Sequence, residues 1–290
     1  MMSNQRDLEE FWNRSATRFG ENATIHMLFR IQGGKERMMS QMSKDDRVQD
    51  LQIGILLATY CESPNIERLI TEIESIQPRA QILVIDDSSP DGTAEIVRKM
   101  QREYPNIQLI VRPGKFGLGT AITDGFKVFL SSKKPPEIVV TLDADYSHDP
   151  QDILRLLACR QNGEGLVIGS RYCRGGRITG WPAVRRIVSK IANTLARSAT
   201  AIKLNDCTSG FRCYSIEFLR TAIGNLHCST YEIQIETARQ AHLHGFGIKE
   251  TPVHFINRKR GKSKLTAAEI TGYVSYILKT IRKKNAYPSP

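Results

Sequence analysis

Short apolar runs alternate with longer amphipathic segments through the middle of the chain. Five runs are rich in β-branched residues and have the length of buried strands, at positions 53–58, 81–85, 107–111, 137–142 and 165–169. Between them, residues 65–76 and 93–104 repeat apolar positions at helical spacing. Strands that alternate with helices predict an α/β fold with a mostly parallel sheet, right-handed crossovers and flanking helices.

The two ends of the chain differ in texture from this central region. Residues 1–50 contain scattered apolar positions and a run of mixed charge from Lys44 to Asp50, so we expect a partly helical and partly mobile N-terminal extension. Residues 51–265 carry the alternating pattern and form the predicted main domain. Residues 266–290 predict a basic amphipathic helix followed by a tail.

Composition places the chain among globular proteins. Of its 290 residues, 40% are hydrophobic, which argues against overall disorder. No run approaches the roughly 18–20 apolar residues of a membrane span, and the polar, acidic first ten residues do not resemble a secretory signal. The six cysteines contain no C-x-x-C pair and indicate neither a zinc site nor a disulfide framework, so we expect a protein of the reducing cytosol.

Positive charge is concentrated in the C-terminal part of the chain, although the formal net charge is +11 overall. Residues 1–50 have 8 lysines and arginines against 8 acidic residues, residues 51–170 have 12 against 16, and residues 171–290 have 21 against 6. This asymmetry indicates an anionic partner for the C-terminal part, which could be nucleic acid, anionic lipid or a phosphorylated substrate. A basic surface that serves only solubility is the alternative.

Two acidic clusters directly follow predicted strands. Asp86 and Asp87 end the second strand, and Asp143 and Asp145 follow the fourth. In parallel sheets, ligands bind beyond the carboxyl ends of the strands, so these side chains should converge on one crevice. A hard divalent cation, Mg²⁺ or Mn²⁺, shared with substrate phosphates would relieve the repulsion between them. Asx turns at the starts of the two loops are the alternative interpretation.

An ordered series of motifs runs through residues 53–265. It comprises ATYCE at 58–62, DDSSPDGT at 86–93, GLGTA at 117–121, DADYSH at 143–148, GSRY at 169–172, GGRITGW at 175–181, DCTSGFR at 206–212 and RKRGKSKL at 258–265. In this order the series resembles the family 2 glycosyltransferases, which have the Rossmann-like GT-A fold, and within them the dolichol-phosphate or polyprenol-phosphate mannosyltransferases. The resemblance implies a metal-dependent, inverting transfer of mannose from GDP-mannose to dolichyl or polyprenyl phosphate, which yields a β-linked lipid-phosphate-mannose.

The resemblance also implies which residues bind the nucleotide sugar and the metal. The residues that match nucleotide-sugar positions are Ala58, Tyr60, Glu62, Ile85, Asp87, Asp143, Ala144, Asp145, Arg171, Arg258 and Lys264. Asp143 and Asp145 match the D-x-D motif that holds Mg²⁺ or Mn²⁺, with Asp145 as the direct ligand. The chain departs from the family pattern at Ala58 and Cys61, where proline and asparagine are usual, and at Ser147, where some relatives carry glutamine.

The catalytic residues implied by the resemblance are Asp145, Arg171, Arg212, Arg258 and Lys264. The metal, Arg258 and Lys264 would stabilise the leaving diphosphate, while Arg171 and Arg212 would hold the attacking phosphate. Arg212 also fits a scaffold role, and a solvated basic loop is the alternative for residues 258–264. The residues that match positions contacting or supporting the acceptor are Ser209, Gln234 and Glu236, and a paired helix face is the alternative for the last two.

Two amphipathic segments in the basic half indicate contact with a membrane surface. Apolar residues recur on one helical face from Val184 to Ile202, and a second segment runs from Ile270 to Ile281. The basic residues opposite the first face are Arg185, Arg186, Lys190 and Arg197. We expect peripheral attachment at the cytoplasmic face of a membrane, where a polyprenyl acceptor resides, with a small membrane-anchor subunit as a further partner. Two helices packed on the main domain, with basic outer faces, are the alternative.

Two other functions fit part of the pattern. The same fold could use a UDP-sugar, carrying glucose or N-acetylhexosamine, as the donor to polyprenyl phosphate. A nucleic-acid-binding protein would explain the positive charge but not the carboxylate pairs, and the sequence has no RRM-type or helix-turn-helix signature. We therefore expect a nucleotide sugar, polyprenyl phosphate and a membrane surface as partners, and no nucleic acid.

Overall fold

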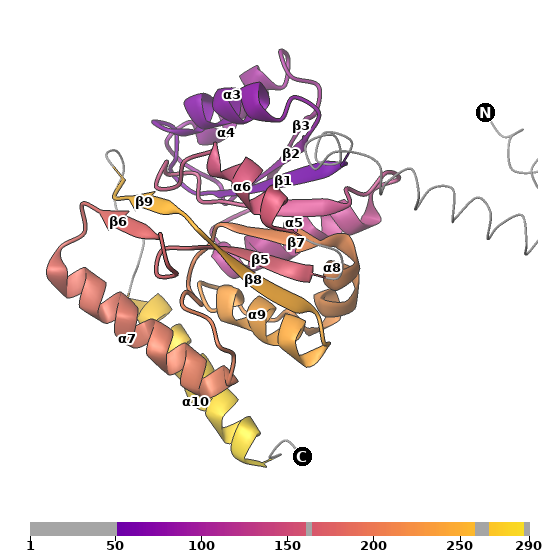
Figure 1. Ribbon diagram of the computed structural model, residues 1–290. Helices are drawn as coiled ribbons and strands as arrows, with labels where there is room; N and C mark the ends of the chain where they lie inside the picture. Colours follow the sequence, from indigo (N-terminus) through magenta and orange to yellow (C-terminus); the bar gives the residue numbers. More distant parts are fainter. Residues whose placement is uncertain (1–50, 161–163, 259–266, 287–290) are drawn as a thin grey trace, which may run out of the picture. The chain divides into compact units, whose positions relative to one another are not determined.

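The computed structural model describes residues 51–160, 164–258 and 267–286, so the predicted extension 1–50 and Lys264 lie outside the described residues. Within them, the strands of the main sheet are β1 (Ile53–Thr59), β2 (Gln81–Asp86), β3 (Ile107–Val111), β4 (Ile138–Thr141), β5 (Glu164–Ser170), β7 (Arg212–Ser215) and β8 (Gly247–Pro252) (Figure 1). A second small sheet pairs β6 (Arg177–Thr179) in parallel with β9 (His254–Ile256). The helices are α3 (Ile66–Ile76), α4 (Thr93–Met100), α5 (Leu118–Ser131), α6 (Asp152–Cys159), α7 (Ala183–Thr200), α8 (Ile216–Ala222), α9 (Ile233–Leu243) and α10 (Ala267–Ala286), and a short 3-10 helix, η1 (Ile223–Asn225), follows α8.

The main sheet has the strand order β3-β2-β1-β4-β7-β5-β8. Its neighbouring strands are parallel except at β7, which is antiparallel to both β4 and β5. The predicted α/β fold with a mostly parallel sheet is therefore confirmed, and all five predicted strands are present. The strands β7 and β8 were not anticipated, because the short β7 contains a buried arginine and β8 has no continuous apolar run.

Alternate residues of the strands face two different layers of helices. Leu83 and Ile85 of β2 belong to an apolar core that also contains Phe126 of α5 and Phe218 of α8. The intervening residues of β2 are equally buried but point to the opposite face, where α4 packs on β2 and β3 and contacts α3. Covering on both faces explains why the parallel strands appear in the sequence as nearly continuous apolar runs.

The helices α7 and α10 run alongside each other, away from the main sheet (Figure 1). The Tyr273 hydroxyl of α10 donates a hydrogen bond to the Ala192 carbonyl oxygen of α7 over 2.6 Å. The residues that α7 buries are Asn193, Ala196 and Ala199. Its large apolar residues are exposed instead: Val184 (71%), Ile187 (57%), Val188 (58%), Ile191 (55%) and Leu195 (43%). The alternative in which α7 packs its apolar face on the main domain is therefore wrong.

Helix α10 also exposes apolar residues. Val274 and Leu278 of this helix are about half exposed, whereas Ile277 between them is buried. We call the exposed apolar residues of α7 together with Val274 and Leu278 the apolar face. None of the helices in the described part of the chain has both the length and the apolar character needed to cross a bilayer.

Candidate active site

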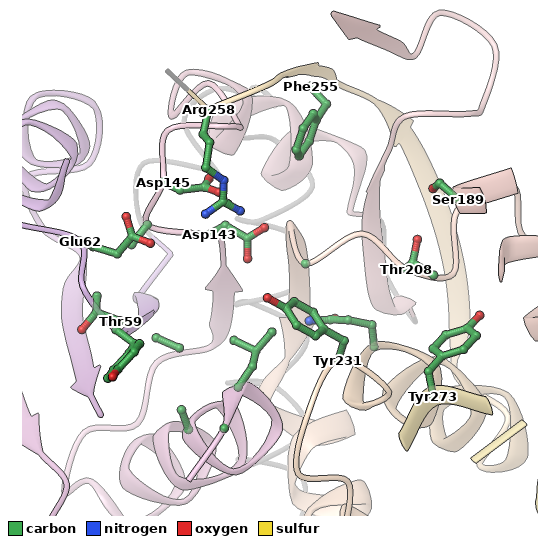
Figure 2. Close-up of a pocket in the computed structure, with 18 of the residues that line it drawn as sticks. Thr59, Glu62, Asp143, Asp145, Ser189, Thr208, Tyr231, Phe255, Arg258 and Tyr273 are labelled. Carbon is green, nitrogen blue, oxygen red and sulfur yellow. The ribbon is translucent and has the colours of Figure 1, made fainter. Parts of the chain in front are cut away.

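A cavity of about 600 Å³ opens at the carboxyl ends of β1 and β4. The predicted site residues that line it are Ala58, Tyr60, Glu62, Asp87, Asp143, Ala144, Asp145, Arg171, Gln234 and Arg258. Figure 2 shows Asp143, Asp145 and Arg258 close together in one part of the cavity, and Ser189 and Tyr273 in another. The parallel strands thus bring together the side chains that the sequence places after them, as expected for this type of sheet.

The acidic pair Asp143 and Asp145 lies beside a cation. Arg258, which follows β9, donates from Nη2 to Oδ2 of Asp145 over 2.7 Å. Burial and the neighbouring Asp145 charge raise the pKa of Asp143 to about 7, against the opposing charges of Arg258 and Arg171. Gly210 approaches so closely that a Cβ there would lie 3.0 Å from Oδ1 of Asp143. Two carboxylates in this arrangement favour the binding of additional positive charge.

Tyr146 fixes the loop that carries Asp145. Its backbone lies in the left-handed region, with φ at 61°, which is uncommon for a residue with a bulky side chain. The Tyr146 hydroxyl bonds to Glu72 of α3, and the Arg68 guanidinium lies 4.5 Å from the centre of the Tyr146 ring. The Ser147 N–H donates to Oδ1 of Asp145 over 2.9 Å. Together these contacts determine where the Asp145 carboxylate points.

Asp87, predicted to bind the nucleotide, is already engaged by the protein itself. Its Oδ1 accepts a hydrogen bond from Nε of Arg112 over 2.5 Å, and its Oδ2 accepts from the N–H groups of residues 116 and 117 over 3.1 and 3.0 Å. This network holds the segment after β3 against the cavity, where Nζ of Lys115 lies 4.5 Å from the centre of the Tyr60 ring. Asp87 therefore shapes this wall, and its predicted hydrogen bond to a ribose stays a prediction.

Arg171 enters the cavity as one half of an ion pair. Its Nε and Nη2 donate to the two carboxylate oxygens of Asp206, each over 2.7 Å, and Nη2 also donates to Oγ1 of Thr208 over 2.7 Å. Burial acts to lower the pKa of Arg171, but Asp206 raises it on balance, and the same pairing holds the pKa of Asp206 below its usual value. Because Asp206 balances its charge, Arg171 offers oriented N–H donors rather than a net positive charge.

Arg185 brings a further cation into the cavity, although its position in the sequence indicates only the basic face of α7. Its guanidinium lies 4.2 Å from the centre of the Trp181 ring and donates to Oδ1 of Asn257 over 3.1 Å. Burial and two neighbouring arginines lower its pKa. Ser189, one helical turn further along, lines the same cavity. The periodicity correctly separates the basic and apolar faces of α7, but it does not say which face is turned toward the protein.

Several predicted site residues lie outside the cavity wall. Arg212 is completely buried and donates to the carbonyl oxygens of Cys207, Ser209 and Gln234. We therefore assign Arg212 the scaffold role, in place of the predicted contact with the acceptor phosphate, because its donors are used inside the protein. Ser209 belongs to the turn that Arg212 holds.

Ile85 and Glu236 are also part of the framework. Ile85 lies in the apolar core and is not part of the cavity wall. Glu236 accepts hydrogen bonds from the N–H groups of residues 227 and 228, each over 2.9 Å. It therefore supports the loop before α9, and its predicted role toward the acceptor stays a prediction. Lys264 lies outside the described residues.

The loop before α9 packs closely on the start of α5 and carries a further cavity residue. The Gly119 N–H donates to the Ser229 carbonyl oxygen over 2.9 Å, and a Cβ at Gly119 would lie only 2.3 Å from the Cys228 carbonyl oxygen. Glycine is therefore needed here for close approach of two backbones. The contact supports the chain that leads to Tyr231, which lines the cavity with Gln234. No signal in the sequence singled out Tyr231.

Comparison with known proteins gives the family of the chain. Residues 55–222 match the family described as glycosyl transferase family 2. This chain belongs to glycosyl transferase family 2. Within it, a polyprenol monophosphomannose synthase from Mycolicibacterium smegmatis is 34% identical over 218 residues, which cover 74% of this chain and 82% of that protein. An undecaprenyl-phosphate mannosyltransferase from Micrococcus luteus is 32% identical over 74% of this chain and 88% of its own length.

Solved structures extend the likeness from the sequence to the fold. Glucosyl-3-phosphoglycerate synthase from Mycobacterium tuberculosis, in complex with Mn²⁺, UDP and glucosyl-3-phosphoglycerate, has a TM-score of 0.59 over 86% of both chains at 16% identity. The complex of that enzyme with phosphoglyceric acid gives a TM-score of 0.60 over the same shares. The predicted family, GT-A fold and glycosyltransferase activity are thereby confirmed.

Proposed function

We propose that this family 2 glycosyltransferase transfers mannose from GDP-mannose to dolichyl or polyprenyl phosphate. The observation that carries the proposal is that one cavity joins the carboxylates and arginines to the apolar face. Val188 lines the cavity and is also 58% exposed on α7. An acceptor with a phosphate head and a hydrocarbon chain fits both parts, because the arginines can bind the phosphate and the apolar face can contact the hydrocarbon. The names of the two mannosyl-transferring relatives support the same sugar and acceptor class.

Asp143 and Asp145 fit a divalent cation, Mg²⁺ or Mn²⁺. Burial and the proximity of the two carboxylates raise the pKa of Asp143, and Gly210 leaves space beside it that a side chain would fill. Among the described residues, no cluster of three or more metal-binding side chains is present, so phosphate oxygens of the donor and water would complete the coordination. When bound, the cation neutralises charge on the leaving diphosphate. The Mn²⁺ in the solved complexes of the M. tuberculosis enzyme supports this assignment.

The arginines of the cavity fit two phosphate groups. Arg258 lies beside the carboxylate pair, where it would hold the donor diphosphate with Lys264. Arg171, Arg185 and Ser189 line the same cavity, where Arg185 and Ser189 flank Val188 of the apolar face, and we assign these three residues to the acceptor phosphate. Guanidinium N–H groups recognise phosphate oxygens in pairs, which gives orientation as well as charge.

The chemistry needs no separate general base. The second pKa of a phosphate monoester is about 6, so the acceptor oxygen is already anionic near neutral pH. That oxygen forms a bond to the anomeric carbon of the sugar, while the bond from this carbon to the diphosphate oxygen breaks and the nucleoside diphosphate leaves with the electron pair. Attack in line with the leaving group inverts an α-linked donor to a β-linked product. The protein contributes orientation and electrostatic stabilisation.

The apolar face fits a membrane surface, which we place on the cytoplasmic side. Its exposed residues on α7 lie next to Arg186 and Lys190, both exposed, so apolar and cationic groups are available to the same lipid interface. A polyprenyl phosphate could then pass its head group into the cavity while its chain stays in the bilayer. A small membrane-anchor subunit that contacts α10 is compatible with this arrangement.

Calorimetric titration tests the donor. The purified protein with Mn²⁺ should bind GDP more tightly than UDP. Tighter binding of UDP would contradict the mannose assignment and favour a UDP-sugar carrying glucose or N-acetylhexosamine. The Asp145→Asn variant is the control for metal-dependent nucleotide binding.

A further inference from the structure

The buried side of α7 is unusual because it contains no large apolar side chain. The helix lies wholly within the described residues and buries Asn193, Ala196 and Ala199. An ordinary surface helix is held by a stripe of large apolar residues that faces the core. In α7 that stripe is exposed, so besides its packing along α10 the helix needs a polar contact to hold it over the cavity.

Asn193 makes this contact with three hydrogen bonds. Its side chain is 2% exposed. Oδ1 accepts from the Cys207 N–H over 2.6 Å, while Nδ2 donates to Oγ1 of Thr208 over 3.2 Å and to the Ser189 carbonyl oxygen over 3.0 Å. The first two bonds join the middle of α7 to the segment before β7, and the third stays within the helix.

The segment that receives Asn193 also holds Arg171. Oγ1 of Thr208 is shared, because it accepts from Nδ2 of Asn193 and from Nη2 of Arg171. Asp206 forms the ion pair with Arg171, and its own N–H donates to Oε1 of Glu250 on β8 over 2.9 Å. One short segment with many hydrogen bonds therefore lies between α7 and the arginine that follows β5, and it is anchored to the main sheet.

We infer that Asn193 is a positioning residue that sets the register of α7 over the cavity and thereby places Arg185 and Ser189 relative to Arg171. Ser189 and Arg185 lie four and eight residues before Asn193, about one and two turns along the same helical face. Ala196 and Ala199 are small and define the rotation of the helix weakly, whereas hydrogen bonds to two fixed partners define it in direction and distance. The part of this inference that concerns the acceptor rests on the proposed function.

The first test follows the helix itself and is independent of any substrate. The chain has two tryptophans, Trp12 and Trp181, so Trp12→Phe leaves Trp181 as the single emitter beside Arg185. In this background, Asn193→Leu removes the three side-chain hydrogen bonds at similar volume and should raise acrylamide quenching of Trp181 about twofold, because Arg185 no longer covers the ring. Thr194→Ala, at an exposed position on the same helix, should leave quenching unchanged. Unchanged quenching in Asn193→Leu would overturn the inference.

The second test separates acceptor from donor. Asn193→Leu should raise KM for polyprenyl phosphate about 10- to 100-fold, since small displacements of binding groups are costly, while KM for the nucleotide sugar stays within about twofold of the wild type. Should the leucine variant unfold, Asn193→Asp keeps the bond from Cys207 and loses the donor to Thr208, and it should show the same selective rise. An equal change in both KM values, or none, would contradict the positioning role. A wild-type protein inactive toward polyprenyl phosphate would refute the proposed function, and the Trp181 measurement would still decide the role of Asn193.

Discussion

At the scale of single residues, the site consists of acidic and basic side chains that form ion pairs with one another. Asp145 pairs with Arg258, Asp206 pairs with Arg171, and Asp143 keeps a raised pKa between them. The sequence predicted the residue types of this cluster correctly, since strand-end carboxylates and arginines have recognisable motifs. It could not show that Asp206 neutralises Arg171, because this pairing depends on two loops that meet only in the fold.

Replacing Asp145 by asparagine should abolish transfer while preserving the fold. The substitution keeps the shape of the side chain and its bond to the Ser147 N–H but removes the charge needed for a cation and for Arg258. We expect activity to fall at least about 100-fold in a metal-dependent transfer assay, with an unchanged thermal midpoint. Asp149→Asn is the matched control, because Asp149 is exposed on the same loop. Retained activity in Asp145→Asn would remove this residue from the metal site.

His148 should make the protein less stable in mild acid. The ring is 2% exposed and packs 5.0 Å from the centres of the Phe211 and Phe255 rings, and burial, followed by the Arg171 charge, lowers its pKa from 6.5 to about 4. Below pH 6.5 His148 binds a proton in the unfolded chain, whereas in the folded protein it stays neutral until the pH approaches 4. The free energy of unfolding therefore falls as the pH drops from 6.5 toward 4, by about 3 kcal/mol in total.

Urea unfolding of His148→Phe at several pH values checks this expectation. The variant should lose less free energy of unfolding than the wild type between pH 6.5 and pH 4, because phenylalanine has no proton to bind. Parallel curves for the two proteins would show that His148 does not contribute to the acid sensitivity.

At the scale of elements, helices with the same spacing of apolar residues differ in whether their apolar face is buried. The apolar stripe of α3 is buried, as its spacing predicts, whereas the stripe of α7 is exposed. The spacing of apolar residues shows that a helix has two unlike faces, but it contains no information about what covers each of them. The strand β7 was missed for a related reason, since its buried Arg212 is satisfied by carbonyl groups from three other positions of the chain.

The apolar face should be needed for binding to lipid vesicles. The double variant Ile187→Asp/Ile191→Asp places two charges on exposed positions, which costs little in folding but opposes insertion at a lipid interface. We expect co-sedimentation with vesicles of mixed neutral and anionic lipid to fall about tenfold. Thr194→Asp, which adds one charge at an exposed polar position of the same helix, should retain most binding. Equal binding by the double variant and the wild type would exclude α7 as the attachment surface.

The contact between α5 and the loop before α9 should be intolerant of any side chain at Gly119. Gly119→Ala brings Cβ to 2.3 Å from the Cys228 carbonyl oxygen, so the backbone must shift. We expect a loss of about 1–3 kcal/mol in the free energy of unfolding, measured in urea. Gly224→Ala is the matched control, because a Cβ there would meet no atom within 4 Å. Equal stability of the two variants would show that the loop adapts without cost.

At the scale of the whole molecule, the acidic and the basic parts of the chain each contribute residues to one cavity. The strands of the acidic part, residues 51–170, supply the carboxylate pair, while the basic part supplies Arg171, Arg185 and Arg258 together with the apolar face. The fold class could be predicted because alternating strands and helices leave few topologies. Contacts between distant segments, such as Tyr231 with the cavity and Asn193 with Thr208, could not, because no local pattern encodes them.

One transfer reaction tests the proposed glycosylation of a lipid phosphate with mannose. The full chain is incubated with radiolabelled GDP-mannose, a polyprenyl phosphate and Mg²⁺ or Mn²⁺, and the products are extracted into organic solvent. We predict metal-dependent label in the organic phase that is absent without the polyprenyl phosphate and is released by mild acid as mannose. No label in that phase, together with transfer from a UDP-sugar under the same conditions, would contradict the mannose assignment.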